Sequence, residues 1–81
     1  MARVFLGSAL QRFTGGVEEV DVQAATVRAL IAELDRRFPG VGDQLRSGIA
    51  VAIDGEIIAD ATYEPLPEDA EVHFLPAIGG G

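Results

Sequence analysis

The sequence predicts an α+β fold in which a mixed sheet of four to five strands carries one main helix on one face. Residues 26–38 have the apolar spacing of an amphipathic helix, whereas five other segments are short, apolar and rich in β-branched residues, as strands are. The apolar stripe of the helix and the apolar faces of the strands can be buried only by packing against each other. We therefore expect one layer of sheet and one of helix, without an internal repeat or a dividing linker.

The first two strands are predicted at 3–7 and 17–22, with 8–10 able to extend the first. The first is mostly apolar, as a central strand is, and the second alternates in part, which favours an antiparallel pair. In the loop between them, Gly15 and Gly16 allow the positive φ that a hairpin turn needs. A phosphate-binding loop is the alternative, but the helix start and spaced lysine of such loops are absent, so we interpret the pair as a turn.

The main helix is predicted to begin after Thr26 and to end before Pro39-Gly40, with a short helical turn at 41–47. The Thr26 hydroxyl can cap the helix, and Arg36 and Arg37 lie in the last turn, where cations interact favourably with the helix dipole. A docking patch is the other interpretation of the arginine pair. The apolar residues follow a helical period and form one stripe: Val27, Leu30, Ile31, Leu34 and Phe38.

A second hairpin is predicted at Asp54-Gly55, between the apolar runs 49–53 and 57–59. A type I′ turn needs positive φ at both central residues, and Asp-Gly is one of the pairs that supply it. The two runs should therefore pair as antiparallel strands.

The last strand is predicted at 71–75, where Val72 and Phe74 face inward and His73 faces outward. Before it, Leu66 in a proline-containing loop should return to the core. His73 is the only histidine, and no cysteine, serine or second histidine stands in a recognisable relation to it. We therefore interpret it as a solvent-facing strand residue and not as a catalytic group.

The composition of the chain excludes several classes of function. The chain has no cysteine, which excludes disulfides, a thiolate nucleophile and cysteine metal sites, and we expect no bound metal. No apolar segment is long enough to span a membrane and no signal-peptide pattern is present, so we predict a cytoplasmic protein. Thirteen acidic residues against six arginines give a formal net charge of -7, which argues against nucleic-acid binding. Such a charge would steer the chain toward a basic partner site, unless it serves solubility alone.

The sequence ends in three glycines, Gly79, Gly80 and Gly81, and we predict a flexible tail at 79–81 behind a domain at 1–78. A backbone without Cβ atoms has the smallest cross-section, so such a tail can enter a narrow channel. It would carry the Gly81 carboxylate into another protein's active site. A carboxylate is a poor electrophile, so chemistry on it normally begins with a better leaving group, such as AMP from ATP. A glycine tail without a role is the alternative.

The ending Phe74-Leu75-Pro76-Ala77-Ile78-Gly79-Gly80-Gly81 resembles that of the MoaD/ThiS family of ubiquitin-like sulfur carriers. There, an aromatic or aliphatic pair, a proline, a branched aliphatic residue and a variable residue precede a terminal diglycine, which matches Gly80 and Gly81. The order of predicted elements is also that of the ubiquitin-like β-grasp fold, in which the first and last strands lie side by side and parallel.

The resemblance implies a sulfur carrier and not an enzyme, with no cofactor bound. An E1-like adenylyltransferase similar to MoeB or ThiF would use ATP and Mg to adenylate Gly81. A sulfur donor, a desulfurase or a rhodanese, would then turn the adenylate into a thiocarboxylate. The acceptor would be the large subunit of molybdopterin synthase, with this chain as the non-catalytic small subunit in molybdenum cofactor biosynthesis.

Other acceptors stay open. The single Pro76 departs from the Pro-Pro that is common in MoaD tails, and Leu-Pro-Ala-Ile also resembles carriers used for cysteine synthesis. ThiS-like members serve the thiazole of thiamin. A ubiquitin-like modifier would instead join Gly81 to lysines of other proteins, and a plain interaction module would not use the tail at all.

The folded body must supply docking energy, because ordering a tail costs roughly 1 to 2 kcal/mol per residue. We expect an exposed apolar patch beside the tail, with Phe5, Leu75, Pro76 and Ile78 as partner-binding residues. The chain also has no lysine, so an activated Gly81 cannot acylate a side-chain amine of another copy. A general preference for arginine over lysine explains the same absence.

Overall fold

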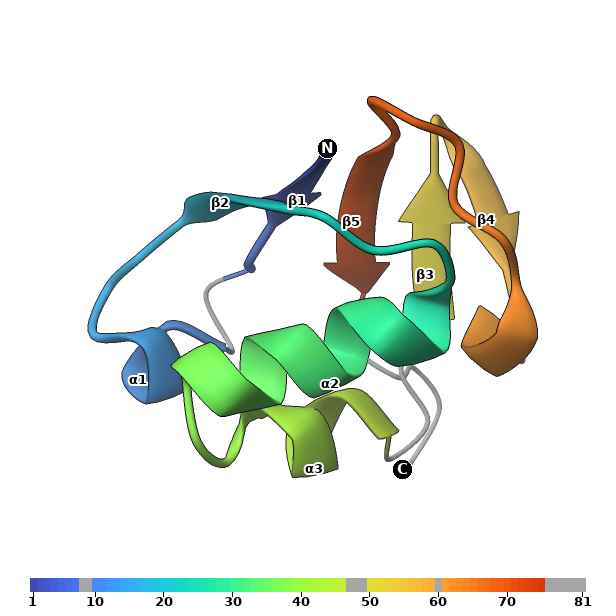
Figure 1. Ribbon diagram of the computed structural model, residues 1–81. Helices are drawn as coiled ribbons and strands as arrows, with labels where there is room; N and C mark the ends of the chain where they lie inside the picture. The colour runs from blue at the N-terminus through green and yellow to red at the C-terminus, as the bar shows by residue number, and fades with distance from the viewer. Residues whose placement is uncertain (8–9, 47–49, 60, 76–81) are drawn as a thin grey trace.

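The computed structural model of the chain describes residues 1–7, 10–46, 50–59 and 61–75, and for Arg46 and Leu75 it describes the backbone. One mixed sheet carries a long helix across one face (Figure 1). The strands are β1 (Ala2–Phe5), β2 (Glu19–Val22), β3 (Ala50–Ile53), β4 (Glu56–Ile58) and β5 (Glu71–Leu75). The helical segments are α1 (Gln11–Thr14), α2 (Val27–Arg37), α3 (Val41–Arg46) and the 3-10 turn η2 (Ala61–Tyr63).

The first and last strands, β1 and β5, lie side by side and parallel at the centre of the sheet, as expected for the predicted fold. The strand order is β2-β1-β5-β3-β4, with antiparallel pairing everywhere else. Val4 and Val72 are register partners in the central pair, and both are fully buried in the core cluster that includes Leu30 of α2. The two ends of the described chain therefore depend on each other for their burial.

Helix α2 confirms the predicted helix. The backbone N–H of Ala29 donates to Thr26 Oγ1 at 3.1 Å, so Thr26 caps the helix, and Phe38 ends it. The predicted stripe faces the sheet and fills the core: Val27, Leu30, Ile31 and Leu34 are buried, and Phe38 packs against them. Helix α3 then closes the core with two buried side chains, Val41 and Leu45, which confirms the helical turn predicted there.

The turn between β3 and β4 is the predicted hairpin. Asp54 has φ 50° and Gly55 has φ 87°, so both central residues are left-handed, as a type I′ turn needs. Asp54 also joins the hairpin to the central strand, because the Glu71 N–H donates to Asp54 Oδ1 at 2.9 Å and the Asp54 N–H donates to the Glu71 carbonyl at 2.8 Å. The hairpin is therefore held by its own turn and by the start of β5.

Replacement of Gly55 by alanine should destabilise the chain by about 1 kcal/mol or more, because a Cβ is disfavoured at positive φ even where space is open. Chemical denaturation followed by circular dichroism measures the change. Gly7→Ala is the matched control, because a Cβ there meets Phe74 O at 4.0 Å and the backbone is not left-handed. Equal stability of the two variants would contradict the turn assignment.

The first loop differs from the prediction. Leu10 and α1 form a helical turn where the sequence predicted a strand extension and an open loop. Leu10 is 4% exposed and Phe13 packs against the core, so burying these side chains outweighs the weak helical signal of four residues. Gly15 and Gly16 do adopt positive φ, and Gly15 caps α1. The chain therefore reaches β2 two residues later than predicted.

The loop before β5 folds back as predicted. Leu66 is buried, and its N–H donates to the Ala25 carbonyl at 2.8 Å. Two residues before Leu66, the Glu64 carbonyl accepts a hydrogen bond from the Val27 N–H at the start of α2, at 3.0 Å. These bonds hold the approach to β5 against the start of α2. Among the helices in the described ranges, none has the length and apolar character needed to cross a membrane.

Candidate functional site

Strand β5 leads directly into the C-terminal segment and is paired along both edges. It pairs in parallel with β1 from Glu71 to His73 and antiparallel with β3 from Val72 to Leu75. Val72 and Phe74 are buried, as predicted. Two ladders and two core side chains fix the strand, so its end at Leu75, which we call the tail base, is a rigid starting point for the residues that follow.

Phe5 and His73 lie side by side on the face of the sheet opposite α2. They are register partners in β1 and β5, and their rings stack with centroids 4.4 Å apart and an interplanar angle of 6°. His73 Nε2 is 3.2 Å from Glu71 Oε1, and 42% of the histidine side chain is exposed. The prediction that His73 faces outward is confirmed, but Phe5 covers part of its ring.

The register extends this pair into a row across the sheet. Ala52 of β3 is the partner of His73, and Ile57 of β4 is the partner of Ala52. Ile57 is 68% exposed, whereas Ala52 beside it is 8% exposed. We call Phe5, Ala52, Ile57 and His73 the outer strip. Because apolar side chains gathered on an exposed face often mark protein-binding surfaces, the outer strip is our candidate docking surface.

Carboxylates flank the outer strip on the same face. Glu19 is the register partner of Phe5, and Arg3 Nε lies 3.1 Å from Glu19 Oε2 and 3.8 Å from Asp21 Oδ1. Glu71 lies on the other side of Arg3 in the register. These side chains are about half exposed, so their ion pairs add little stability. The carboxylates of Glu19, Asp21 and Glu71 outnumber the single Arg3 guanidinium, so this border of the outer strip is acidic, and we call these four residues the acidic rim. A partner surface with basic residues at its edge complements this charge.

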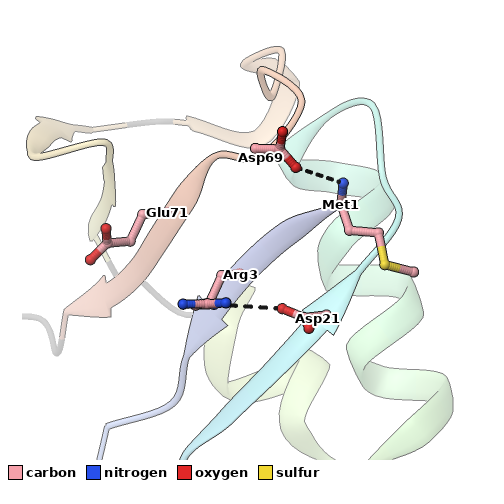
Figure 2. Close-up of a pocket in the computed structure, with 5 residues that line it drawn as sticks. All are labelled: Met1, Arg3, Asp21, Asp69 and Glu71. Carbon is pink, nitrogen blue, oxygen red and sulfur yellow. Dashed lines mark hydrogen bonds and ion pairs between the residues drawn. The ribbon is translucent and has the colours of Figure 1, made fainter.

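A polar hollow lies where β1 and β5 begin, and Arg3, Asp21 and Glu71 belong both to it and to the acidic rim (Figure 2). Its volume is about 260 Å³, and Met1, Arg3, Asp21, Asp69 and Glu71 line it. The Met1 amino nitrogen is 3.5 Å from Asp69 Oδ1. Because β1 and β5 are parallel and both begin here, the hollow is at the opposite end of β5 from the tail base. Its cations face its own carboxylates, so it is separate from the predicted tail chemistry.

Arg36 and Arg37 both bind Glu33 on α2. Arg36 Nε donates to Glu33 Oε1 at 3.0 Å, and Arg37 Nε donates to Glu33 Oε2 at 2.9 Å. These hydrogen bonds, first from Arg36 and then from Arg37, lower the pKa of Glu33 from 4.5 to about 2. Arg37 Nη1 also donates to the Asp21 carbonyl at 3.1 Å, which covers part of the free edge of β2. The pair thus supports the helix end and the sheet edge.

Glu33→Gln should remove a pH-dependent part of the stability. The folded pKa of Glu33 lies below its ordinary value, so its ion pairs stabilise the native state above pH 4.5, and this contribution is lost as the pH falls toward 2. We expect wild type to melt higher than Glu33→Gln at neutral pH and the two melting temperatures to converge near pH 2. Glu68→Gln, an exposed carboxylate in the loop before β5, is the matched control. A gap for Glu33→Gln that is the same at every pH would contradict this assignment.

Among the predicted partner-binding residues, Phe5 is the one for which the structure describes both backbone and side chain, and it lies on the outer strip. For Leu75 the structure gives the backbone, opposite Ala50 in the sheet. The predicted boundary between 1–78 and 79–81 lies outside the described residues. So do the remaining predicted site residues: Pro76, Ile78, Gly79, Gly80 and Gly81.

Sequence reasoning did not assign Ala52, Ile57 and His73 to the docking surface. Two signals could have found them. The parallel register of the first and last strands places His73 beside Phe5, and alternation through the second hairpin places Ile57 on the outer face. Within the described ranges, no three His, Cys, Asp or Glu side chains are grouped so that they could hold a metal ion.

The sheet order, the parallel central pair and the single covering helix define a ubiquitin-like β-grasp protein. A chain in the crystal structure of the Amycolatopsis orientalis BexX/CysO complex has a TM-score of 0.87 to this chain at 24% identity, with 100% of both chains covered. The solution structure of small archaeal modifier protein 1 from Methanosarcina acetivorans has a TM-score of 0.82 at 19% identity, covering 99% of this chain and 95% of that one. These similarities show the fold.

Sequence comparison shows the family. The ThiS family model matches residues 5–81, so the chain belongs to the ThiS family and is a sulfur carrier of the MoaD/ThiS type. A molybdopterin synthase sulfur carrier subunit from Pyrenophora tritici-repentis (strain Pt-1C-BFP) is 27% identical over 77 residues, which cover 91% of this chain and 83% of that protein. The family resemblance seen in the sequence is therefore confirmed.

Proposed function

We propose that the Gly81 carboxylate is the group that carries sulfur, as a thiocarboxylate, and that this sulfur is used in molybdopterin synthesis. The observation that carries the proposal is the family match, which continues to residue 81 and so includes the glycine ending. The fungal relative is named a molybdopterin synthase sulfur carrier subunit, which favours this acceptor. The fixed tail base at the end of β5 supports the use of the following residues as a handle.

The chemistry takes place in partner enzymes. An E1-like adenylyltransferase of the MoeB/ThiF kind, with ATP and Mg, joins a Gly81 carboxylate oxygen to AMP and releases pyrophosphate, which gives the acyl carbon a good leaving group. A persulfide on a desulfurase or rhodanese attacks the acyl carbon and displaces AMP, which gives an acyl disulfide. A second thiol then attacks the donor sulfur of this acyl disulfide, forms a disulfide with it and releases the thiocarboxylate, so that sulfur replaces one carboxylate oxygen. The thiocarboxylate then passes its sulfur to a pterin precursor held by the large subunit of molybdopterin synthase.

The outer strip is the surface that we assign to docking of these partners. Phe5 and His73 lie on the two strands β1 and β5, and β5 continues from His73 to the tail base, so a partner bound to the outer strip lies next to the tail base. The acidic rim fits an apolar partner surface edged by arginine or lysine. Because one surface serves both the activating enzyme and the acceptor enzyme, the two bind in turn and not together.

Sulfur delivery to cysteine or to the thiazole of thiamin is the second candidate. It rests on Leu75-Pro76-Ala77-Ile78, which resembles the ending of carriers used for cysteine synthesis. A third candidate, favoured by the likeness to small archaeal modifier protein 1, is conjugation of Gly81 to lysines of other proteins. All three begin with the same activation of Gly81.

A single-turnover reconstitution tests the acceptor. The thiocarboxylated chain is mixed with the large subunit of molybdopterin synthase and a pterin precursor, and we expect molybdopterin to form in proportion to the loaded chain. The same chain without sulfur is the control. If the loaded chain transfers its sulfur to a cysteine-forming enzyme and none to the pterin, the acceptor is wrong although the carrier role stands.

A further inference from the structure

We infer that none of the side chains of this protein accepts the activated C-terminus of another copy, so that the protein forms no side-chain-linked chains of itself. The inference rests on the proposed activation of Gly81. Its starting observation is that the 81 residues include no lysine and no cysteine, and hence no side-chain amine or thiol. These are the side chains that attack an activated acyl group most readily.

The positions that carry positive charge are all arginine. A guanidinium group stays protonated and does not act as a nucleophile, whereas a lysine amine does once it loses its proton. Some of these arginines make contacts that lysine cannot reproduce. Arg36 donates through Nε and Nη2 to both oxygens of Glu33, and Arg37 reaches Glu33 and a backbone carbonyl at once.

The other described arginines make contacts that lysine can also make. Arg3 forms single ion-pair contacts with Glu19 and Asp21, and the guanidinium carbons of Arg12 and Arg28 lie over aromatic rings at 5.0 and 5.9 Å. An ammonium group forms ion pairs and cation-π contacts of the same kind. The local contacts therefore do not explain why lysine is absent from positions 3, 12 and 28, where an amine would be exposed.

The hydroxyl groups in the described residues are poor substitutes. Thr14 is buried and its Oγ1 donates to the Val17 carbonyl at 3.0 Å, while Thr26 Oγ1 caps α2. Thr62 and Tyr63 are both exposed on η2, and the Arg28 guanidinium lies over the Tyr63 ring. Hydroxyl groups need an adjacent general base to act as nucleophiles, and the one histidine lies on the outer strip against Phe5.

Because the chain has no lysine, the Met1 α-amino group is the one amine among the described residues. It lies 3.5 Å from Asp69 Oδ1 in the polar hollow, at the end of the sheet opposite the tail base (Figure 2). In an acyl transfer, an amine nitrogen attacks the Gly81 acyl carbon and forms a C–N bond. The bond to the leaving group breaks, AMP or a thiol departs, and the ammonium proton passes to solvent. Any amide between two copies is thus confined to Met1.

A chemically prepared thioester tests the inference without an activating enzyme or a sulfur donor. The chain is released from an intein fusion as a C-terminal thioester and incubated at high concentration and mildly alkaline pH, and intact mass with peptide mapping locates any linkage. The paired variants are R12K/R28K, which introduces two exposed amines, and R12Q/R28Q, which removes the same charges without adding an amine.

We expect side-chain-linked dimers from R12K/R28K, located at the two introduced amines, and none from wild type or R12Q/R28Q. Wild-type products should be hydrolysed chain and, at most, linkage through the Met1 nitrogen. Side-chain-linked wild-type dimers would overturn the inference. So would an R12K/R28K sample that forms no side-chain linkage, because missing lysine would then not be the cause. Failure of sulfur loading would overturn the proposed function and leave this result unchanged.

Discussion

Deletion of Gly81 should abolish sulfur loading and leave the fold intact. The diglycine ending places one particular carboxylate in the activating enzyme, and removal of a residue shifts the new terminus by about 3.5 Å. Misplacement of a reacting group by about 1 Å can cost about 100-fold in rate, so we expect at least that loss in adenylation. The measurement is ATP–pyrophosphate exchange with the E1-like enzyme, followed by intact mass.

Addition of one alanine after Gly81 is the matched variant, because it moves the terminus in the other direction and adds a Cβ. The buried core is built from residues between Ala2 and Phe74, so both variants should unfold within about 0.5 kcal/mol of wild type. Loading of either variant at the wild-type rate would contradict the assignment of the reactive group to Gly81.

Introduction of a carboxylate into the outer strip should weaken both partner complexes by about 2 kcal/mol, or about 30-fold in Kd. Phe5→Glu places a charge at the β1 end of the strip and removes the ring that stacks on His73. Because Phe5 is only partly exposed, Ile57→Glu is needed as a second variant, since 68% of Ile57 is exposed and its loss should not disturb the fold. Calorimetry with the E1-like enzyme and with the acceptor subunit measures the change.

Tyr63→Glu is the matched control for docking, because Tyr63 is as exposed as Ile57 but lies on η2, which packs against α2. It should leave both affinities unchanged. If Ile57→Glu and Phe5→Glu bind both partners as wild type does, docking takes place on another face. If one partner alone is affected, the two enzymes use different surfaces and need not bind in turn.

The sequence predicted the fold well where local signals were strong. The helix cap at Thr26, the stripe led by Leu30 and the Asp54-Gly55 turn each depend on neighbouring residues and are all confirmed. Helix α1 was missed because four residues cannot show a helical period, and its formation depends on burial of Leu10 and Phe13 against distant parts of the chain. Local reasoning fails where tertiary packing decides.

The candidate site divides in the same way. The glycine tail is a contiguous motif, so the sequence alone indicates its residues; they lie outside the described part of the structure, and their role stays a prediction. The outer strip joins β1, β3, β4 and β5, and the grouping of Phe5 with Ile57 depends on the register of β1 with β5 and of β5 with β3, strands that are distant in the sequence. Phe5 was predicted because the first strand was expected to lie beside the last strand and so beside the tail, whereas Ala52, Ile57 and His73 needed the register.

The most direct test of the account is the mass of the Gly81 carboxyl group itself. The chain is incubated with an E1-like adenylyltransferase, ATP, Mg, a persulfide donor and a thiol reductant, and its intact mass is measured before and after. We predict a gain equal to the exchange of one oxygen for one sulfur, located at Gly81 by fragmentation and absent when ATP is withheld. An unchanged mass with active partner enzymes, or a sulfur placed on any other residue, would contradict the claim that this chain carries sulfur on its C-terminus.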